Sequence, residues 1–306
     1  MTAIAACAVR SHRFYASTLG LPLVKRTVTH NDPGAYHLYY GDAAGRPGTI
    51  FSLIVWERAA AGRPGKGEAE RLFLRAPAAS LDWWHGRLRL AAVQLEGTAT
   101  FLDQPALYFR DPSGVPLALL GESGIAAEPA WNTDKVPERH ALRGLFGVIL
   151  TVQNAASLAA ILGDVLGLRE AGRENGCVRL LSGADVGGSI LLHQMPGSAR
   201  GRLGRGTINH VAFRAADPGA QDAMVERLRS AHGIVATPPI DRVYYRSVQF
   251  REPGGFMFEI ATDGPGFAVD EPFAALGQTL ALPPHLEERR AEIESILPRL
   301  PRGARR

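Results

Sequence analysis

Two side chains in the last third of the sequence could together bind a metal ion, His210 and Glu259. His210 lies in the alternating run INHVAFRA, and Glu259 lies in FMFEI, an otherwise apolar run; both patterns predict β-strands. A carboxylate in such a strand is costly unless a cation or a hydrogen-bond donor meets it, whereas a lone strand histidine is more often a satisfied core residue. On neighbouring strands, the pair would supply two ligands of a His, His, carboxylate site with open positions on Fe(II).

An internal duplication of the sequence supports the interpretation of Glu259 as a metal ligand. The segments 14–21 and 161–168 both end in Leu-Gly-Leu, where the glycine supplies the left-handed residue that ends a predicted helix. Near the end of each half, Phe-Arg-Asp-Pro-Ser-Gly at 109–114 corresponds to Phe-Arg-Glu-Pro-Gly-Gly at 250–255, and each predicts a strand, a tight turn and a strand. This alignment sets Glu259 against Ala118, so the first half forms the same strand without an acid.

The elements that must position these residues form four units, each with one strand, one helix and about three further strands. Such units cannot bury a sheet face alone, so they must pair, and paired curved sheets leave a concave cleft. The sequence predicts a first domain at 1–121, a linker at 122–142, a second domain with the metal ligands at 143–264 and a C-terminal extension at 265–306. A helix in this extension is expected to pack on the second half.

The composition excludes several classes of protein. Hydrophobic residues make up 46% of the chain and charged residues 21%, and no run approaches the roughly 20 apolar residues of a membrane span. The opening residues lack a basic region before their apolar run, so they predict a strand rather than a signal peptide. Cys7 and Cys177 lie far apart, which indicates neither a disulfide framework nor a thiolate zinc site. A soluble, cytoplasmic protein without a membrane partner is expected.

The net charge of +4 does not indicate a nucleic-acid partner. The basic residues are almost all arginines and are scattered among acids, whereas a nucleic-acid surface would show a basic patch with stacking aromatics.

Longer motifs connect these residues with a known family. YHLYYGDAAGRPGTI at 36–50, DRVYYRSVQFREPGGFMFEIATDGPGF at 241–267 and the flanking LGLPLVKRTV resemble the ring-cleaving dioxygenases of the vicinal oxygen chelate superfamily, also called the glyoxalase, bleomycin-resistance and extradiol dioxygenase superfamily. The resemblance covers nearly the whole chain and is strongest to the hydroquinone and chlorohydroquinone dioxygenases. It implies an α+β fold of four βαβββ modules in two tandem vicinal-oxygen-chelate domains, with curved mixed sheets forming a cleft and a C-terminal helix.

The resemblance also implies a mononuclear Fe(II) site, or occasionally Mn(II), whose family ligands correspond to His210 and Glu259. The remaining family ligand lies in a His-His-Val-Thr start, of which only Thr2 stands in this sequence. Either a start codon lies further upstream or the ligand has been lost, and an in-frame His-His pair in the upstream DNA would decide between these alternatives. Thr2 is therefore a candidate catalytic residue, with Asn209 and Gln249, where the family has His and Tyr, and with Arg242, which matches a family position.

Arg242 could stabilise developing negative charge on oxygen, or it could form an ion pair with Asp241 or another surface acid. His37, Tyr244 and Tyr245 are candidate substrate-binding residues, although packing would equally explain aromatic residues in strands. His12, in a predicted helix, is expected to be exposed to solvent.

Three functions remain open at this stage. The leading interpretation is an Fe(II)-dependent dioxygenase that cleaves a hydroquinone-like or catechol-like ring, with a small aromatic substrate and dioxygen as partners. The second is a glyoxalase-type metal isomerase, which would consume no oxygen. The third is a metal-poor protein that binds a small aromatic compound, as bleomycin-resistance relatives bind their drug. A homo-oligomer is compatible with each of them.

Overall fold

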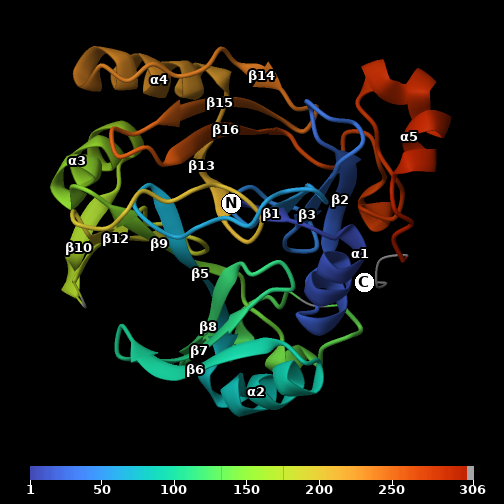
Figure 1. Cartoon of the computed structure of the whole chain (residues 1–306), viewed down its shortest axis with the longest axis horizontal. Coiled ribbons are helices and arrows are strands. Elements are labelled where there is room, and N and C mark those ends of the chain that lie inside the picture. The colour runs from blue at the N-terminus through green and yellow to red at the C-terminus, as the bar shows by residue number, and fades with distance from the viewer. Residues whose placement is uncertain (132, 175, 302–306) are drawn as a thin grey trace.

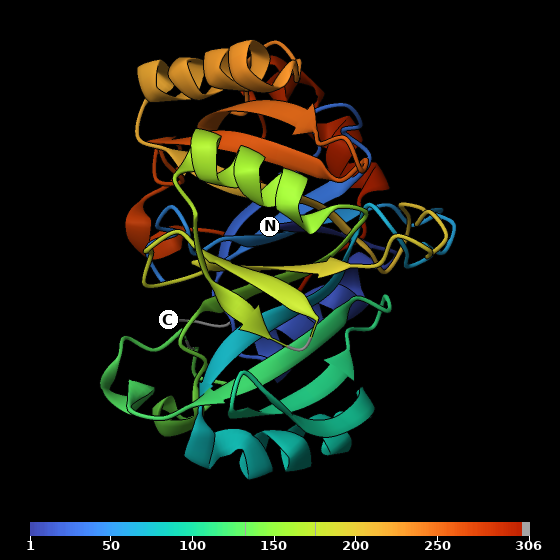
Figure 2. The same cartoon turned by 90° about the vertical axis from the view of Figure 1, so that its left-hand side faces the viewer.

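The computed structural model describes residues 1–131, 133–174 and 176–301, and its strands form two eight-stranded mixed sheets (Figures 1 and 2). The α+β fold predicted from the repeats is confirmed. The remainder of the predicted C-terminal extension, 302–306, lies outside the described residues. No helix within the described ranges is long and apolar enough to cross a membrane.

One sheet joins the two ends of the chain, and we call it the site sheet. Its strand order is β14-β15-β16-β13-β1-β4-β3-β2. In Figure 1 the blue strands from the start of the chain lie beside the orange strands from its end. The strands of the first module are β1 (Thr2–Ala5), β2 (Leu23–Val28), β3 (Tyr36–Tyr40) and β4 (Phe51–Val55). Those of the fourth module are β13 (Ile208–Ala215), β14 (Ile240–Asp241), β15 (Tyr245–Arg251) and β16 (Met257–Pro265).

The other sheet is built from the middle of the chain, and we call it the core sheet. Its order is β10-β11-β12-β9-β5-β8-β7-β6. The second module contributes β5 (Glu68–Pro77), β6 (Gln94–Phe101), β7 (Gln104–Arg110) and β8 (Pro116–Glu122). The third contributes β9 (Leu145–Val152), β10 (Arg169–Glu174), β11 (Cys177–Leu181) and β12 (Ser189–Gln194). Each sheet therefore takes strands from both predicted domains, 1–121 and 143–264, whose boundaries remain a prediction.

Each module also carries a helical segment, which follows its first strand. These segments are α1 (Ala8–His12) with a π-helical turn (Arg13–Thr18), a 3₁₀ turn (Ala78–Ser80) with α2 (Leu81–Leu90), α3 (Ala155–Leu166) and α4 (Pro218–His232). Gly20 and Gly167 both have φ of 72°, the left-handed conformation predicted from the two Leu-Gly-Leu motifs. At the N-terminus of α4, the Asp217 side chain accepts a hydrogen bond from the amide of Ala220, which caps the helix.

His12 does not lie in solvent as expected, and this part of the sequence analysis was wrong. Its side chain is buried, and Nδ1 lies 3.1 Å from the hydroxyl of Tyr40. Burial, with a smaller effect of the Arg26 charge, lowers the pKa of His12 to about 4. The reason is that α1 is short and packs along the site sheet, so that this imidazole lies over β3.

The helical part of the C-terminal extension packs on the first module and not on the second half, which corrects another expectation. The start of the extension does contact the second half, where Asp270 accepts from the Tyr244 hydroxyl. It contains three short helical segments: Phe273–Ala275, Pro284–Arg289 and α5 (Arg290–Ile296). The hydroxyl of Tyr36 donates to the carbonyl oxygen of Pro298 at 3.0 Å, and the amide of Ala281 donates to that of Arg26 at 2.9 Å. The extension covers this end of the site sheet, where β2 is the edge strand and β3 lies beside it (Figure 1).

Candidate metal centre and cavity

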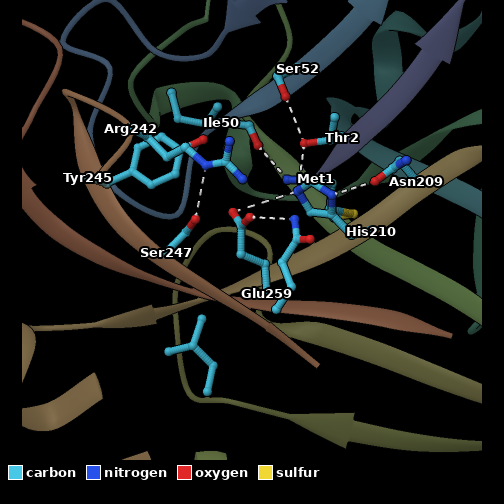
Figure 3. Close-up of polar contacts among 12 residues, drawn as sticks. Met1, Thr2, Ile50, Ser52, Asn209, His210, Arg242, Tyr245, Ser247 and Glu259 are labelled. Carbon is cyan, nitrogen blue, oxygen red and sulfur yellow. Dashed lines mark hydrogen bonds and ion pairs between the residues drawn. The ribbon is translucent and has the colours of Figure 1, made fainter. Parts of the chain in front are cut away.

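His210 and Glu259 lie on neighbouring parallel strands, β13 and β16, and their side chains face one another (Figure 3). The distance from His210 Nε2 to Glu259 Oε1 is 3.7 Å. Both residues are buried, with 6% and 3% of their surfaces exposed. Two atoms that each bind one ion at about 2.1 Å lie no more than about 4.2 Å apart, so this pair can reach a common metal ion.

The chemical surroundings of Glu259 fit a cation. Its Oε2 atom accepts a hydrogen bond from the Gln249 side-chain amide at 3.0 Å, across the β15–β16 pair. A buried carboxylate has capacity for further donors, and its burial is costly without a compensating positive charge. A metal ion between Glu259 and His210 would supply that charge.

Across the described ranges, no group of three or more His, Cys, Asp or Glu side chains is arranged to hold a metal ion. The pair therefore fits a metal as a two-donor site. Thr2 is the register partner of His210, so the start of β1 adjoins the pair, and the Met1 amino group donates to the carbonyl oxygen of Ile50 at 2.9 Å. The third ligand expected before Met1 falls outside the given sequence and stays a prediction.

Asn209 fixes the orientation and the tautomer of the His210 ring. His210 Nδ1 lies 2.8 Å from Asn209 Oδ1, and an amide oxygen can only accept, so Nδ1 carries the proton. In a neutral ring this leaves a lone pair on Nε2. Burial lowers the pKa of His210, although Glu259 acts in the opposite direction, so the neutral form is favoured. The lone pair accepts a hydrogen bond from the Thr2 hydroxyl at 2.9 Å.

Arg242 points into the same region (Figure 3). Its Nε donates to the Ser247 hydroxyl at 3.2 Å, and among the described residues Arg242 forms no ion pair with Asp241. Its positive charge is close enough to lower the pKa values of His210 and Tyr245, in each case as a smaller cause than the burial of the affected group. Arg242 is thus a fixed cation beside the candidate centre.

An aromatic wall bounds the cavity in front of the pair. The cavity measures about 1250 Å³, and Tyr39, Tyr244, Tyr245 and Phe267 line it together with His210 and Glu259. The Tyr244 hydroxyl donates to Asp270 of the C-terminal extension at 2.9 Å, so this ring is held from behind. Burial, then the charge of Glu259, raises the pKa of Tyr245, which keeps its hydroxyl protonated.

His37 does not line the cavity itself but lies behind this wall. Its Nε2 is 3.0 Å from the Ser52 hydroxyl, and its Nδ1 is 2.9 Å from the Tyr39 hydroxyl. Sequence reasoning missed Ser52 and Tyr39. The alternation of β3 places His37 and Tyr39 on one face and was a usable signal, but Ser52 becomes their neighbour only through the β3–β4 register.

The core sheet has no counterpart of this site among its described residues. Phe73 is the register partner of Ala118, the position that the duplication aligns with Glu259. Its ring stacks on Phe101 with ring centres 4.3 Å apart, in an apolar cluster that includes Ala118. The same strand geometry is therefore filled with hydrocarbon where the site sheet carries charge.

Comparisons with known proteins agree on one superfamily. Residues 140–260 match the model of the Glyoxalase/Bleomycin resistance protein/Dioxygenase superfamily. The chain is 39% identical to "Putative ring-cleaving dioxygenase MhqE" of Bacillus subtilis, over 98% of this chain and 97% of that protein. It is 28% identical to "Chlorohydroquinone/hydroquinone 1,2-dioxygenase" of Sphingobium indicum, over 88% of this chain and 86% of that protein.

Solved structures agree as well. A crystal structure of a "putative dioxygenase" from Bacillus subtilis has a TM-score of 0.92 at 35% identity and covers 98% of this chain and 96% of that chain. Glyoxalase I from Zea mays has a TM-score of 0.65 at 11% identity, covering 86% of this chain and 90% of that chain, and this likeness concerns the fold alone.

Proposed function

Because the chain belongs to the glyoxalase, bleomycin resistance protein and dioxygenase superfamily, we propose that it is an Fe(II)-dependent enzyme that opens the ring of a hydroquinone-like or catechol-like diphenol. Two of its relatives are named as a ring-cleaving dioxygenase and as a chlorohydroquinone/hydroquinone dioxygenase. The observation that carries the proposal is the buried His210–Glu259 pair, with 3.7 Å between Nε2 and Oε1 at the wall of a cavity. The substrate and the metal are proposals drawn from the named relatives and from this geometry.

His210 and Glu259 would hold the metal. Ferrous iron bound there would supply the redox chemistry by which dioxygen reacts with the ring. The protein's own contribution begins with ligand orientation. Asn209 holds the proton of His210 on Nδ1, so that Nε2 could bind the metal in place of its hydrogen bond from Thr2, and Gln249 holds one oxygen of Glu259. Such outer hydrogen bonds commonly change metal affinity or activity by about 10- to 100-fold.

The aromatic wall would select and position the ring of the substrate. Tyr39, Tyr245 and Phe267 offer flat apolar surfaces, and the two tyrosines add hydroxyl groups that a diphenol can contact. Arg242 would stabilise the negative charge of a phenolate oxygen, since its guanidinium is always protonated and lies beside Tyr245 (Figure 3).

The test is metal content together with oxygen consumption. Protein loaded with Fe(II) without oxygen should hold about one iron per chain and should consume oxygen when hydroquinone or catechol is added. Glu259→Gln should lose both properties, whereas Glu226→Gln, a change of an exposed acid on α4, should keep both. Iron binding without oxygen consumption with any diphenol would refute the dioxygenase assignment, and failure to retain iron or manganese would refute the metal site.

A further inference from the structure

The cavity beside the candidate metal centre is much larger than one aromatic ring requires. It measures about 1250 Å³, whereas an apolar cavity of about 150 Å³ already holds a molecule of benzene. Pockets of about 300–1,000 Å³ are enough to bury most of the surface of a drug-sized ligand. A diphenol of a single ring, stacked on the aromatic wall, would therefore leave most of this volume to water.

Beyond the aromatic wall the cavity continues between the two sheets, and we call this part the inter-sheet arm. On the side of the site sheet it is bounded by the later residues of β13 and β16. On the opposite side it is lined by apolar residues of the core sheet and of the segments beside that sheet: Leu145 and Val148 of β9, Ile190 of β12, Leu168 and Val186. Hydrocarbon of both sheets thus borders a space that a single ring does not fill.

The floor of the inter-sheet arm is smooth because small residues follow the candidate metal-binding pair. The alternation of β16 places Glu259, Ala261 and Asp263 on one face, and that of β13 places Ala212 on the same face as His210. All five residues line the cavity. A strand rises about 3.3 Å per residue, so the floor runs for about 13 Å from Glu259 to Asp263. Along this length Ala212 and Ala261 contribute only methyl groups, which leaves room for a ligand to lie on the sheet.

The arginines around the inter-sheet arm already have partners. Among the described residues, four arginines line the cavity: Arg46 pairs with Asp42, Arg75 with Glu122 and Glu128, and Arg214 with Asp263, while Arg143 donates to four backbone carbonyl oxygens. Arg214, at the far end of the floor, donates to both carboxylate oxygens of Asp263, at 2.9 and 2.8 Å. A guanidinium whose hydrogen bonds are made in this way has little to gain from an anionic ligand, and a charged group leaving water without a partner is costly. The arm therefore favours an uncharged, apolar occupant.

We propose that the ring of the substrate carries an extended apolar substituent, an alkyl chain or a second aromatic ring, and that this substituent occupies the inter-sheet arm. The diphenol ring then lies against the aromatic wall formed by Tyr39, Tyr245 and Phe267. This inference rests on the proposed function, and it deepens that function by naming the substrate class, a hydroquinone or catechol with one long hydrophobic substituent. Ala261 is then a residue that determines specificity, because its small side chain keeps the floor of the arm open.

Burial of hydrocarbon supplies the selectivity for such a substrate. Each methylene group that moves from water into an apolar site lowers the dissociation constant about fourfold, so a butyl group that is wholly enclosed lowers it about 250-fold. The surfaces that enclose it are the methyl groups of the floor and the leucine, isoleucine and valine side chains opposite. A charged group at the end of the same chain loses this gain, because it leaves water without meeting a partner.

Two variants block the inter-sheet arm from opposite sides. Ala261 is partly exposed while its neighbours Ile260 and Thr262 are buried, so Ala261→Leu extends a side chain into the cavity and not into the core. Val186→Phe fills the arm from the segment between β11 and β12 of the core sheet. Ala156→Leu is the matched control, because it makes the same change as Ala261→Leu at an exposed position of α3.

The test compares the binding of diphenols that differ in their substituent. The probes are hydroquinone, ethylhydroquinone, butylhydroquinone and a butylhydroquinone whose chain ends in a carboxylate. Calorimetry without oxygen, with saturating Zn²⁺ as a metal that has no redox chemistry, gives the dissociation constants. For native protein and Ala156→Leu we expect butylhydroquinone to bind about 250-fold more tightly than hydroquinone, with ethylhydroquinone between them, and the carboxylate probe to bind at least about tenfold more weakly than butylhydroquinone. In Ala261→Leu and Val186→Phe the ratio between hydroquinone and butylhydroquinone should fall to about tenfold or less.

Equal dissociation constants for hydroquinone and butylhydroquinone with native protein would overturn the inference, as would an undiminished ratio in both blocking variants. A carboxylate probe that binds as tightly as butylhydroquinone would refute an apolar occupant. The inference and the proposed reaction fail separately, because the ratio is measured without oxygen. Native protein that shows the expected ratio but consumes no oxygen with any diphenol supports the inter-sheet arm and refutes the dioxygenase. Oxygen consumption with hydroquinone together with a ratio near one refutes the arm alone.

Discussion

The replacement Lys25→Met tests how the C-terminal extension is attached to the site sheet. Lys25 is fully buried on β2, and its Nζ lies 2.6 Å from Asp270 Oδ1 and 2.5 Å from Glu271 Oε2. The ammonium also lies 4.7 Å from the centre of the Tyr244 ring, which lines the cavity. Methionine keeps the unbranched stem but leaves two carboxylates without their cation.

The magnitude follows from the burial of the partners. Removing one partner of a buried ion pair costs about 3–5 kcal/mol, chiefly because the remaining charge is stranded. The side chain of Asp270 is 29% exposed and accepts from Tyr244, and Glu271 accepts from the Thr279 hydroxyl, so each carboxylate keeps at least one hydrogen-bond donor. We therefore expect the lower end of this range, a loss of about 3 kcal/mol in the free energy of unfolding.

Urea unfolding followed by circular dichroism measures this loss, provided that the dependence on urea concentration is unchanged between variants. The triple variant Lys25→Met, Asp270→Asn, Glu271→Gln should recover much of the stability, because no buried charge is then left unpaired. The KM for a diphenol should rise in Lys25→Met, since Tyr244 loses its anchored surroundings. A loss below about 1 kcal/mol, the range of exposed pairs, or no recovery in the triple variant, would refute the reasoning.

Three further predictions concern the site and its pH dependence. Saturating Zn²⁺ at about 100 times its dissociation constant should add about 2.7 kcal/mol to the stability of native protein, and calorimetry should show this gain lost in Glu259→Gln and kept in Glu226→Gln. Arg242→Gln should lower kcat for a diphenol by about 100-fold, whereas the exposed change Arg229→Gln should leave steady-state rates unaltered. His12 has a pKa of about 4 in the folded protein and 6.5 when it is exposed, so the unfolded state binds more protons between these pH values. The free energy of unfolding should therefore fall as the pH drops from 6.5 to 4. Urea unfolding at several pH values should show a smaller fall in His12→Gln.

Local patterns were sufficient to predict the modules and to single out His210 and Glu259, whose side chains the fold brings together. The Leu-Gly-Leu motifs indicated where the first helix of each half ends, because glycine has no side chain that opposes a φ of 72°, the value at Gly20 and Gly167. The comparison of Glu259 with Ala118 identified an acid that the strand did not need. Glu259 meets His210 because their strands, β13 and β16, are neighbours within one module. The module pattern drawn from the duplication was therefore enough to predict this contact.

Contacts between distant segments were not predictable in the same way. The pairing of β1 with both β4 and β13 joins the first and fourth modules, and no periodicity within one segment specifies a partner so far along the chain. Ser52 acquires its place beside Thr2 and Tyr39 only through the register of β4 with β1 and β3. For the same reason the sequence placed the C-terminal helix on the wrong module, since its apolar face is compatible with any uncovered sheet edge.

The duplication explains how the protein can carry so much buried charge on one sheet. The site sheet buries His210, Glu259 and Lys25, each of which is costly to remove from water. The equivalent strands of the core sheet pack with apolar residues instead. There the stacked rings of Phe73 and Phe101 fill the space beside small residues. Because one continuous apolar core includes residues of both sheets, hydrophobic burial on the core sheet can offset the cost of the polar site on the site sheet. A fold with two like sheets can therefore carry the polar site on one sheet while the other sheet contributes apolar packing.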